Sequence, residues 1–292
     1  MGERGLAAAA IWERISIVMP TTPLIHPTAI VSADAHLAAD VTVGPFTIID
    51  GPVVIGSGSA IGPHCHLLGH LTLGAGNVIG TGCVLGDKPQ HLAYKNEPTR
   101  TIIGDNNIFR EYVTVHRGMP VGSESTTIGN NNLFMVNSHV AHDCHVGNHC
   151  IFANGAVIGG HVEVGDRAFL SGNSAVHQLC RVGRLALIGG TSAISQDLPP
   201  FWICQGRINT LHGVNVIGMR RAGMAKEEIA AVRQAYKLLN RTGNTIPSAL
   251  EIIEAEFGTL PAIRELIAFI KATKRGICTG HQKSNDDTHD PD

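Results

Sequence analysis

The sequence predicts an all-β parallel β-helix built from hexapeptide repeats and followed by a C-terminal α-helical domain. Three observations support this prediction. Aliphatic residues recur at every sixth position, glycine follows many of them, and near the C-terminus the apolar period changes to that of a helix. One hexad cannot bury its own apolar side chain, so neighbouring repeats must stack and enclose the aliphatic positions.

The hexads form two blocks, separated by segments in which the period breaks. If three hexads make one triangular coil, about eighteen residues return the chain to the same face, roughly 4.8 Å further along the axis. We expect the β-helix to cover residues 24–200, with loops at 86–101 and 117–127. Loops that interrupt a solenoid usually project from one face and serve binding.

A second pattern follows the hexads. Pro199 and Pro200 end the repeats, and apolar residues then recur with a helical period from about Ala225 to Ile270. We therefore expect a helical domain over residues 201–280, capping the end of the β-helix.

The composition and the termini exclude several classes of protein. The 292 residues carry a net charge of −2, which gives no reason to expect nucleic-acid binding. No run of about twenty apolar residues is present, so we expect no integral membrane segment. We expect residues 1–23 to form a disordered extension rather than a signal peptide, and residues 281–292 to form a disordered tail.

The seven cysteines show no paired spacing. Most fall four places after a repeat aliphatic, in a slot that serine, threonine and alanine also fill. We interpret them as buried reduced thiols rather than disulfides or metal ligands, which favours a reducing compartment such as the cytoplasm. The cysteines in this slot are Cys65, Cys83, Cys144, Cys150 and Cys180.

Histidines are concentrated in the second block of repeats. His142 follows a repeat aliphatic, and His161 and His177 fall on nearly the same face about one and two coils further along. His139 is expected at the preceding corner, from which it can lean toward this row. A stacked row of imidazoles is hard to explain by packing alone, so we predict a site here.

The residues around His142 favour proton transfer. Asp143 follows it, and a carboxylate beside an imidazole can fix its tautomer and stabilise the protonated ring. Cys144 is expected to point inward, so no nucleophile is paired with the base, and direct proton abstraction from an acceptor is preferred. Backbone N–H groups of Gly159 and Gly160, one coil further along, are candidates to face a developing oxyanion.

The sequence closely resembles the UDP-N-acetylglucosamine 3-O-acyltransferases of bacterial lipid A biosynthesis. The resemblance extends from about Leu24 to Ile277 and is carried by the runs NSHVAHDCHVGN, GDKPQHLAYKNEPTR, VTVHRG, AVHQ and GVNVIGMRRAG. It implies a left-handed β-helix, a homotrimer and active sites in clefts between subunits. It also implies a (3-hydroxy)acyl donor carried on the phosphopantetheine of acyl carrier protein, a UDP-sugar acceptor, and no bound cofactor or metal.

The resemblance assigns roles to individual residues. His142 would be the general base on the sugar 3-hydroxyl, Asp143 would support it, and the Gly160 amide would stabilise the oxyanion. Gly190, two to three coils beyond His142, would lie where the acyl chain ends and, lacking a side chain, would admit chains longer than about ten carbons. The substrate contacts would be Gln90, His91, His116, His139, His161, His177, Gln178, Asn215 and Arg221.

The helical end offers a basic surface for the carrier protein, and four positions of the chain depart from the family pattern. The helical end carries basic residues suited to an acidic carrier protein, namely Arg220, Arg221, Arg233, Lys237 and Arg241. The family often has aspartate, lysine, glutamate and arginine at the positions of His91, Ala93, Ile217 and Ala222. These departures leave the acceptor open between the 3-hydroxy and the 3-amino UDP-sugar.

The residue pattern leaves two other functions open. A zinc enzyme like the γ-type carbonic anhydrases would use the same fold and histidine ligands. His139 and His145 lie one hexad apart and therefore on different faces, so one subunit cannot easily bring them to one ion, although ligands shared across a trimer would allow it. A non-catalytic scaffold would instead tolerate the loss of His142.

Overall fold

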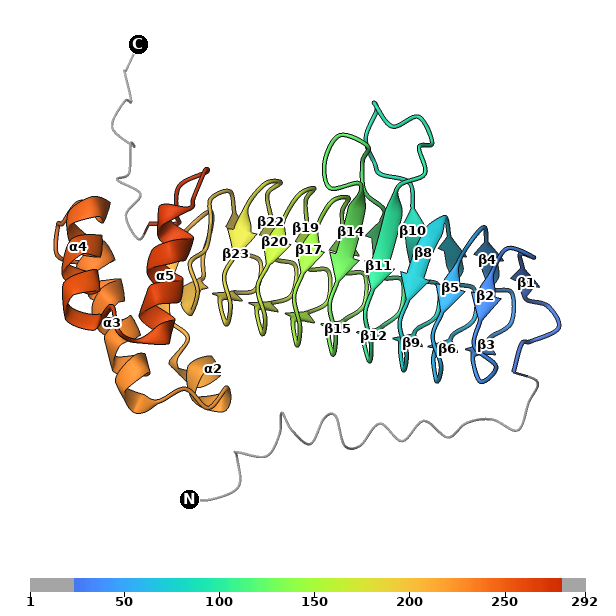
Figure 1. The fold of residues 1–292 in the computed structure, drawn as a ribbon, viewed down its shortest axis with the longest axis horizontal. Coiled ribbons are helices and arrows are strands. Elements are labelled where there is room, and N and C mark those ends of the chain that lie inside the picture. Colours follow the sequence, from blue (N-terminus) through green and yellow to red (C-terminus); the bar gives the residue numbers. More distant parts are fainter. Residues whose placement is uncertain (1–23, 280–292) are drawn as a thin grey trace, which may run out of the picture.

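The computed structural model describes residues 24–279 and confirms the predicted fold class. Figure 1 shows a long three-sided β-helix with a cluster of helices at its C-terminal end. The expected N-terminal extension, residues 1–23, and the expected tail, residues 281–292, lie outside the described residues.

Three sheets form the sides of the β-helix, and each coil gives one short strand to each sheet. The nine-stranded sheet contains β1 (Ile30–Val31), β4 (Ile48–Asp50), β7 (His66–Leu68), β10 (Val84–Asp87), β13 (Thr114–His116), β16 (His139–Val140), β19 (Val157–Ile158), β22 (Ala175–Val176) and β25 (Ala193–Ile194). The eight-stranded sheet contains β2 (His36–Leu37), β5 (Val54–Ile55), β8 (His70–Leu73), β11 (Arg100–Ile103), β14 (Ser125–Ile128), β17 (His145–Val146), β20 (Glu163–Val164) and β23 (Arg181–Val182). The ten-stranded sheet contains β3 (Thr42–Val43), β6 (Ala60–Ile61), β9 (Val78–Ile79), β12 (Ile108–Phe109), β15 (Leu133–Phe134), β18 (Ile151–Phe152), β21 (Phe169–Leu170), β24 (Leu187–Ile188), β26 (Trp202–Cys204) and β27 (Leu211–Val214).

The strand register follows the predicted coil. In regular coils a residue pairs with the one eighteen positions later, as Val140 does with Ile158. Leu85 pairs instead with Val115, and Val115 pairs with Val140. Each of the two insertions is therefore absorbed within one coil, and the aliphatic positions stay aligned on both sides of it.

The repeat aliphatics and the cysteines fill the interior. Phe109, Phe134 and Phe152 occupy repeat positions and stack in successive coils, with ring centroids 4.7 and 4.8 Å apart. All seven cysteines are free thiols and buried, as predicted. Aromatic and aliphatic side chains thus form a continuous core along the β-helix axis.

Both loops are shorter than the sequence indicated. Strands β10 and β11 extend into the first one, and β14 extends into the second, so the irregular segments are residues 88–99 and 117–124. The extra strand residues are polar and pair with neighbouring coils, as Arg100 does with His70 on one side and Ser125 on the other. Backbone hydrogen bonds between strands set these boundaries, and such bonds leave no trace in the hydrophobic pattern of the sequence.

The segment expected to be helical, 201–280, begins with two strands. β26 pairs in parallel with β24, and β27 returns antiparallel to it. Trp202 of β26 is fully buried and packs edge-on against Tyr236, with ring centroids 5.1 Å apart. The helices follow as α2 (Val216–Arg221), α3 (Lys226–Asn240), α4 (Ile246–Phe257) and α5 (Pro261–Lys271).

The last helix is fixed to the β-helix by charged side chains. Arg184 Nη2 lies 2.7 Å from Glu265 Oε2 of α5, and Arg181 Nη2 lies 2.8 Å from Asp197 Oδ2. The Thr273 hydroxyl donates to the same Asp197 oxygen at 2.7 Å. Within residues 24–279, every helix is too short or too polar to span a bilayer.

One edge of the β-helix contains a ladder of buried asparagines. We call it the asparagine edge; here the chain turns from the eight-stranded to the ten-stranded sheet. Asn107 donates its side-chain amide to Asn77 Oδ1 at 3.1 Å, and Asn132 donates to Asn107 Oδ1 at 2.9 Å. All three are fully buried. The side-chain amide of each asparagine also donates to a carbonyl of the following coil, so contacts between coils remove the penalty of burying these groups.

Candidate active site

The predicted site lies on a second edge, where the chain turns from the nine-stranded to the eight-stranded sheet. We call it the histidine edge. Both loops belong to it, and Figure 1 shows them projecting on the same side of the molecule, as the sequence predicted. The segments that form this edge around the histidines are residues 88–99, 117–124, 141–144, 159–162 and 177–180.

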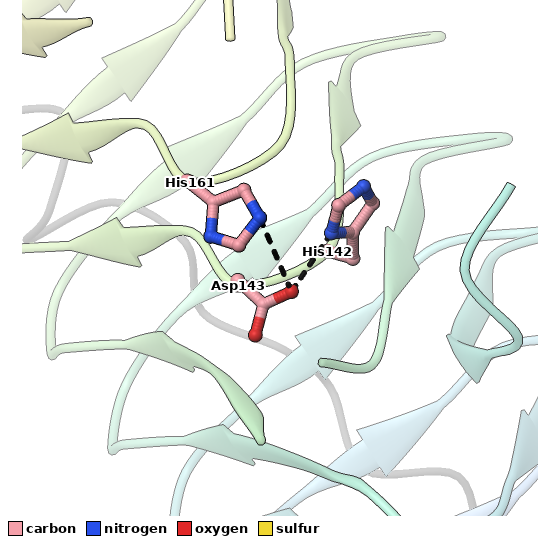
Figure 2. A group of neighbouring side chains, drawn as sticks. All are labelled: His142, Asp143 and His161. Atoms are coloured by element: carbon pink, nitrogen blue, oxygen red, sulfur yellow. Dashed lines mark hydrogen bonds and ion pairs between the residues drawn. The ribbon is translucent and has the colours of Figure 1, made fainter. Parts of the chain in front are cut away.

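His142, Asp143 and His161 meet at this edge (Figure 2). His142 Nδ1 lies 2.8 Å from Asp143 Oδ2, and His161 Nε2 lies 3.9 Å from the same oxygen. The two imidazoles contact edge to face, with centroids 5.2 Å apart. The predicted contact between successive coils is therefore present.

The backbone turn explains how these side chains converge. Asp143 and His161 hold equivalent positions in consecutive coils, and both have left-handed φ angles, 58° and 59°. An added Cβ at Gly160, the residue above His142, would lie 2.7 Å from His142 Nε2. A larger residue at position 160 would therefore displace the His142 ring.

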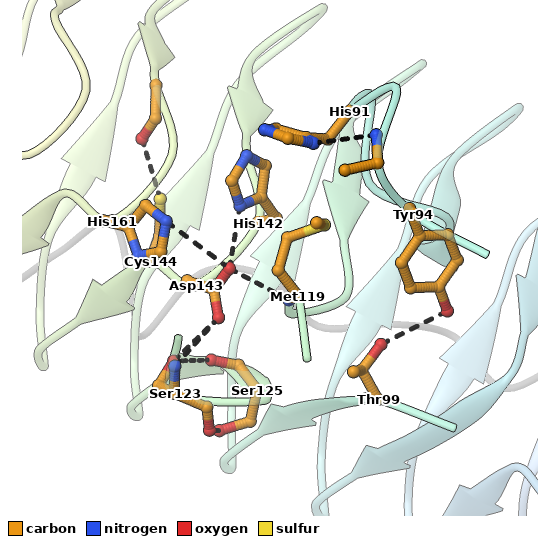
Figure 3. Close-up of polar contacts among 12 residues, drawn as sticks. His91, Tyr94, Thr99, Met119, Ser123, Ser125, His142, Asp143, Cys144 and His161 are labelled. Carbon is orange, nitrogen blue, oxygen red and sulfur yellow. Dashed lines mark hydrogen bonds and ion pairs between the residues drawn. The ribbon is translucent and has the colours of Figure 1, made fainter. Parts of the chain in front are cut away.

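Asp143 also holds the second loop in place (Figure 3). Its side chain is fully buried and accepts the Met119 N–H at 2.9 Å and the Ser123 N–H at 3.1 Å. Burial opposes ionisation, but hydrogen bonds from His142 and Met119 and the nearby His161 outweigh it, so the pKa of Asp143 lies below its ordinary value. Sequence reasoning missed this role because two of the donors are backbone N–H groups and the third, the Ser123 hydroxyl, belongs to an irregular loop, so no side-chain pattern marks them.

The hydrogen bond to Asp143 sets the tautomer of His142. Because Nδ1 donates to the carboxylate, Nε2 of the neutral ring carries the lone pair. The His142 side chain is 12% exposed, so this nitrogen is accessible yet mostly shielded. Within residues 24–279, the Gly160 N–H beside it donates to no protein acceptor. A base and a free donor thus lie together.

Cys144 does not compete with this base. Its thiol is fully buried and directed toward the Gly159 carbonyl at 3.1 Å. Burial raises the pKa of the Cys144 thiol to about 12, so it stays protonated near pH 7. The predicted inward orientation is confirmed.

A second histidine pair lies next to this group on the nine-stranded sheet. His139 belongs to strand β16 rather than to a corner, and its ring packs edge-on against His116 at 4.9 Å. Burial, with the charges of His116 and His142, lowers the pKa of His139 to about 4. Burial also lowers the pKa of His116, whose Nδ1 is buried without a hydrogen-bond partner. Both rings are neutral at pH 7.

The remaining residues expected near His142 are exposed around it. The ring of His91 in the first loop stands edge-on to His142, with centroids 5.8 Å apart, and Gln90 lies exposed beside it. His177 and Gln178 lie exposed at the next coil of the same edge.

Three expected site residues lie elsewhere in the chain. Gly190 is at the third edge, between β24 and β25, where its added Cβ would meet only Gly172 O at 3.6 Å. Asn215 caps α2 and donates its side-chain amide to Leu185 O at 2.9 Å. Arg221 is exposed at the end of α2. An acyl chain following the histidine edge from His142 therefore does not reach Gly190 of the same copy.

The site also contains a possible set of metal ligands. Ligand atoms of His142, Asp143 and His161 lie within 4.8 Å of one another. The Asp143 oxygens, however, already accept hydrogen bonds from His142 and from loop amides, so an ion would have to displace the His142 proton. His139 and His145 lie on different sheets, as their spacing predicted.

Two family models match the chain. The model described as UDP N-acetylglucosamine O-acyltransferase, domain 2, matches residues 197–278. The model of the bacterial transferase hexapeptide, six repeats, matches residues 52–87 and 125–160. The second match includes the segment that carries His142.

Relatives match over nearly their whole length. The acyl-[acyl-carrier-protein]–UDP-N-acetylglucosamine O-acyltransferase of Thermodesulfovibrio yellowstonii is 42% identical over 87% of this chain and 98% of its own. The structure of the Francisella novicida UDP-N-acetylglucosamine acyltransferase matches with a TM-score of 0.84 at 34% identity, covering 87% of this chain and 94% of that one. The Moraxella catarrhalis UDP-N-acetylglucosamine O-acyltransferase matches with a TM-score of 0.83 at 36% identity, covering 88% and 100%. The fold is thus a left-handed parallel β-helix, and the chain belongs to the UDP-N-acetylglucosamine O-acyltransferase family.

Proposed function

We propose that this protein transfers a (3-hydroxy)acyl chain from acyl carrier protein to the 3-position of UDP-N-acetylglucosamine, the first step of lipid A biosynthesis. The observation that carries the proposal is the pairing of His142 Nδ1 with Asp143 at 2.8 Å, which leaves Nε2 free beside the Gly160 amide. The match of 42% identity to an enzyme named for this reaction supports it.

The reaction follows from these groups. His142 Nε2 takes the proton of the sugar 3-hydroxyl as its oxygen attacks the thioester carbonyl, and Asp143 stabilises the imidazolium that forms. The carbonyl oxygen becomes negative and accepts the Gly160 N–H. When the tetrahedral intermediate collapses, the carbon–sulfur bond breaks and His142 returns the proton to the phosphopantetheine thiolate. No cofactor enters this sequence.

The surrounding side chains suit a neutral, hydroxyl-rich acceptor. His116 and His139 are uncharged at pH 7, so their ring nitrogens can exchange hydrogen bonds with sugar hydroxyls without desolvating a charge. We assign the remaining substrate contacts to Gln90, His91, His161, His177, Gln178, Asn215 and Arg221.

We further propose that a neighbouring copy completes the site in a homotrimer. The outward row of the ten-stranded sheet supports this because it contains no charged residue and is partly exposed along its length, whereas the eight-stranded sheet has Glu163 beside Arg181. A second copy is the occupant that would bury it. The apolar residues in this row are Ala60, Val78, Ile108, Leu133, Ile151, Phe169, Leu187 and Ile203.

The same arrangement explains why Gly190, Asn215 and Arg221 lie away from His142. Gly190 borders the ten-stranded sheet, so in a trimer packed through that face it belongs to the groove of a neighbour. We propose that it measures acyl chain length there. The basic residues of α2 and α3 are exposed at the end of the β-helix, and we propose that the acidic carrier protein binds them. We also propose that the reaction takes place in the cytoplasm.

The deciding experiment offers the purified protein acyl carrier protein loaded with 3-hydroxyacyl chains of several lengths. UDP-N-acetylglucosamine and its 3-amino analogue serve as alternative acceptors. We expect acyl transfer to the 3-hydroxy sugar with chains longer than about ten carbons. Preference for the 3-amino sugar would make that sugar the acceptor, and transfer to neither sugar would refute the proposed function. Metal analysis of the same sample tests the zinc alternative.

A further inference from the structure

Tyr94, in the middle of the first loop, is held by a buried arginine. Arg117 Nε donates to the Tyr94 hydroxyl oxygen at 2.9 Å, and its guanidinium carbon lies 5.5 Å from the tyrosine ring centroid. The Tyr94 hydroxyl in turn donates to the Glu97 carbonyl and lies 3.3 Å from the Thr99 hydroxyl. The tyrosine therefore links the two loops of the histidine edge. Figure 3 shows its hydroxyl next to that of Thr99.

Arg117 is a rigid anchor for this contact. It is 9% exposed, and its backbone N–H donates to the Asp87 carbonyl at 2.9 Å. Its guanidinium lies against Gly69, where any side chain would overlap it. Among residues 24–279 it forms no ion pair. A buried cation without a carboxylate depends on neutral acceptors, so the Tyr94 oxygen matters more than an exposed hydroxyl would.

The same tyrosine fixes the position of His91. The Tyr94 N–H donates to the His91 carbonyl at 3.1 Å, and the Ala93 N–H donates to His91 Nδ1 at 3.2 Å. His91 and Tyr94 are thus two ends of one turn. Because Nδ1 accepts, neutral His91 carries its proton on Nε2, a donor next to the His142 ring.

We infer that Tyr94 is a positioning residue for acyl transfer: clamped by Arg117, it fixes the turn that holds His91 beside the base His142. This inference rests on the proposed function. Without the clamp the turn loses the hydrogen bond that ties Tyr94 to Arg117, and His91 no longer keeps a fixed place over the acceptor. Positioning of this kind acts on acceptor binding more than on the proton transfer itself.

The test is Tyr94→Phe, which keeps the ring and removes the oxygen. Tyr112→Phe is the matched control, because Tyr112 is an exposed tyrosine at a different edge, the one between β12 and β13. We expect the KM for the UDP-sugar to rise about tenfold in Tyr94→Phe, the size of one lost hydrogen bond to a charged group, with kcat changed less than about threefold. The control should match the wild type.

A double-mutant cycle separates positioning from general loosening. If Tyr94 acts through His91, Tyr94→Phe should have no further effect on KM in a His91→Ala background, whereas a merely structural effect would multiply with it. Additive effects, or an unchanged KM in the single variant, would overturn the inference.

Amide exchange tests the clamp without any assay of activity. Exchange at the Ala93 and Tyr94 amides should accelerate by about tenfold or more in Tyr94→Phe and stay unchanged in Tyr112→Phe. If the wild type shows no acyl transfer but this exchange pattern appears, the proposed function fails while the clamp stands. If transfer is normal and exchange is unaffected, the clamp is wrong and the function stands.

Discussion

The asparagine edge and the histidine edge are built by the same repeat, yet they treat buried polar groups in opposite ways. On the asparagine edge, Asn107 satisfies Asn77 and is satisfied by Asn132, so polar side chains pair with one another from coil to coil. On the histidine edge, His142 Nε2 has no hydrogen-bond partner among residues 24–279, and on the adjoining strand β13 His116 Nδ1 is buried without one. Polar groups that pair internally stabilise the fold, and those left open are available to a substrate.

The insertions follow the same division. Both irregular loops, 88–99 and 117–124, interrupt the histidine edge, while the connections that contain the asparagine ladder keep the hexad length. Asp143 accepts hydrogen bonds from two backbone N–H groups of the second loop, and these bonds hold the loop over part of the histidine edge. The insertions thus occur at the edge that forms the site, whereas the edge with the asparagine ladder keeps the repeat length that aligns its side chains.

The largest expected effect is a loss of transfer activity when His142 on the histidine edge is replaced. His142→Ala should lower kcat by about 10²–10⁴-fold, the contribution of a general base, and leave the unfolding midpoint nearly unchanged because the ring lies outside the core. A steady-state transfer assay and a thermal melt measure the two quantities. His145→Ala, at an exposed position on β17, is the control. Near-normal turnover of His142→Ala would remove the mechanism.

At the asparagine ladder we expect a substitution to lower stability and to leave activity nearly unchanged. Asn107→Ala removes the oxygen that accepts both the backbone N–H and the side-chain amide of Asn132, and it takes away one of the two donors to the Asn77 oxygen. The free energy of unfolding should therefore fall by about 2–4 kcal/mol with kcat little changed. Denaturant titration measures the loss. Asn148→Ala, on the outer side of the same edge, should cost less than half as much. Equal losses would mean that burial of the ladder is unimportant.

Acid should destabilise the protein through His139, which lies on the nine-stranded sheet next to the histidine edge. Its folded pKa is about 4, against about 6.5 when unfolded, so between these values the unfolded chain binds a proton that the folded chain does not. Stability should therefore fall by about 1–3 kcal/mol as pH drops from 6.5 to 4, and His139→Gln should flatten that slope.

His145→Gln is the matched control for the acid effect. His145 Nδ1 lies 2.7 Å from the Thr127 hydroxyl, as His139 Nδ1 does from that of Thr114, but its position is exposed. Urea midpoints measured across pH should keep the wild-type slope in this variant. A slope that His139→Gln leaves intact would assign the acid sensitivity to other groups.

The smallest effect concerns the third edge. Gly190→Met should shift donor preference toward chains of about ten carbons, because each excluded methylene forfeits roughly 0.8 kcal/mol of burial. Competition between acylated carriers of different length measures the shift. Unchanged selectivity would show that chain length is measured elsewhere.

Much of the scaffold could be predicted from the sequence, because a strict period leaves one way to bury the aliphatic positions. The same coil length predicted that His161 would meet His142. It also carries information about Gly190, which lies two hexads past a whole number of coils from His142 and so falls on another edge. The distance along the axis between His142 and Gly190 does not by itself show that the two residues lie on different edges.

The contacts made by the insertions could not be predicted. Residues 88–99 and 117–124 have no period, so nothing in the sequence indicates that Ser123 would reach Asp143 or that Tyr94 would reach Arg117. These contacts depend on how irregular backbone folds over a finished edge. Two residues of recognisable motifs, Tyr94 and Arg117, therefore received no role until the structure placed them together.

The most direct test of the account is the protonation of the His142 ring in the folded protein. In a sample with ¹⁵N-labelled histidine, the neutral ring should show a protonated Nδ1 and an unprotonated Nε2, because Asp143 accepts the Nδ1 proton. Asp143→Asn should release this preference. A neutral His142 that carries its proton on Nε2 in the wild type would contradict the assignment of His142 as the base, since no lone pair would then face the acceptor.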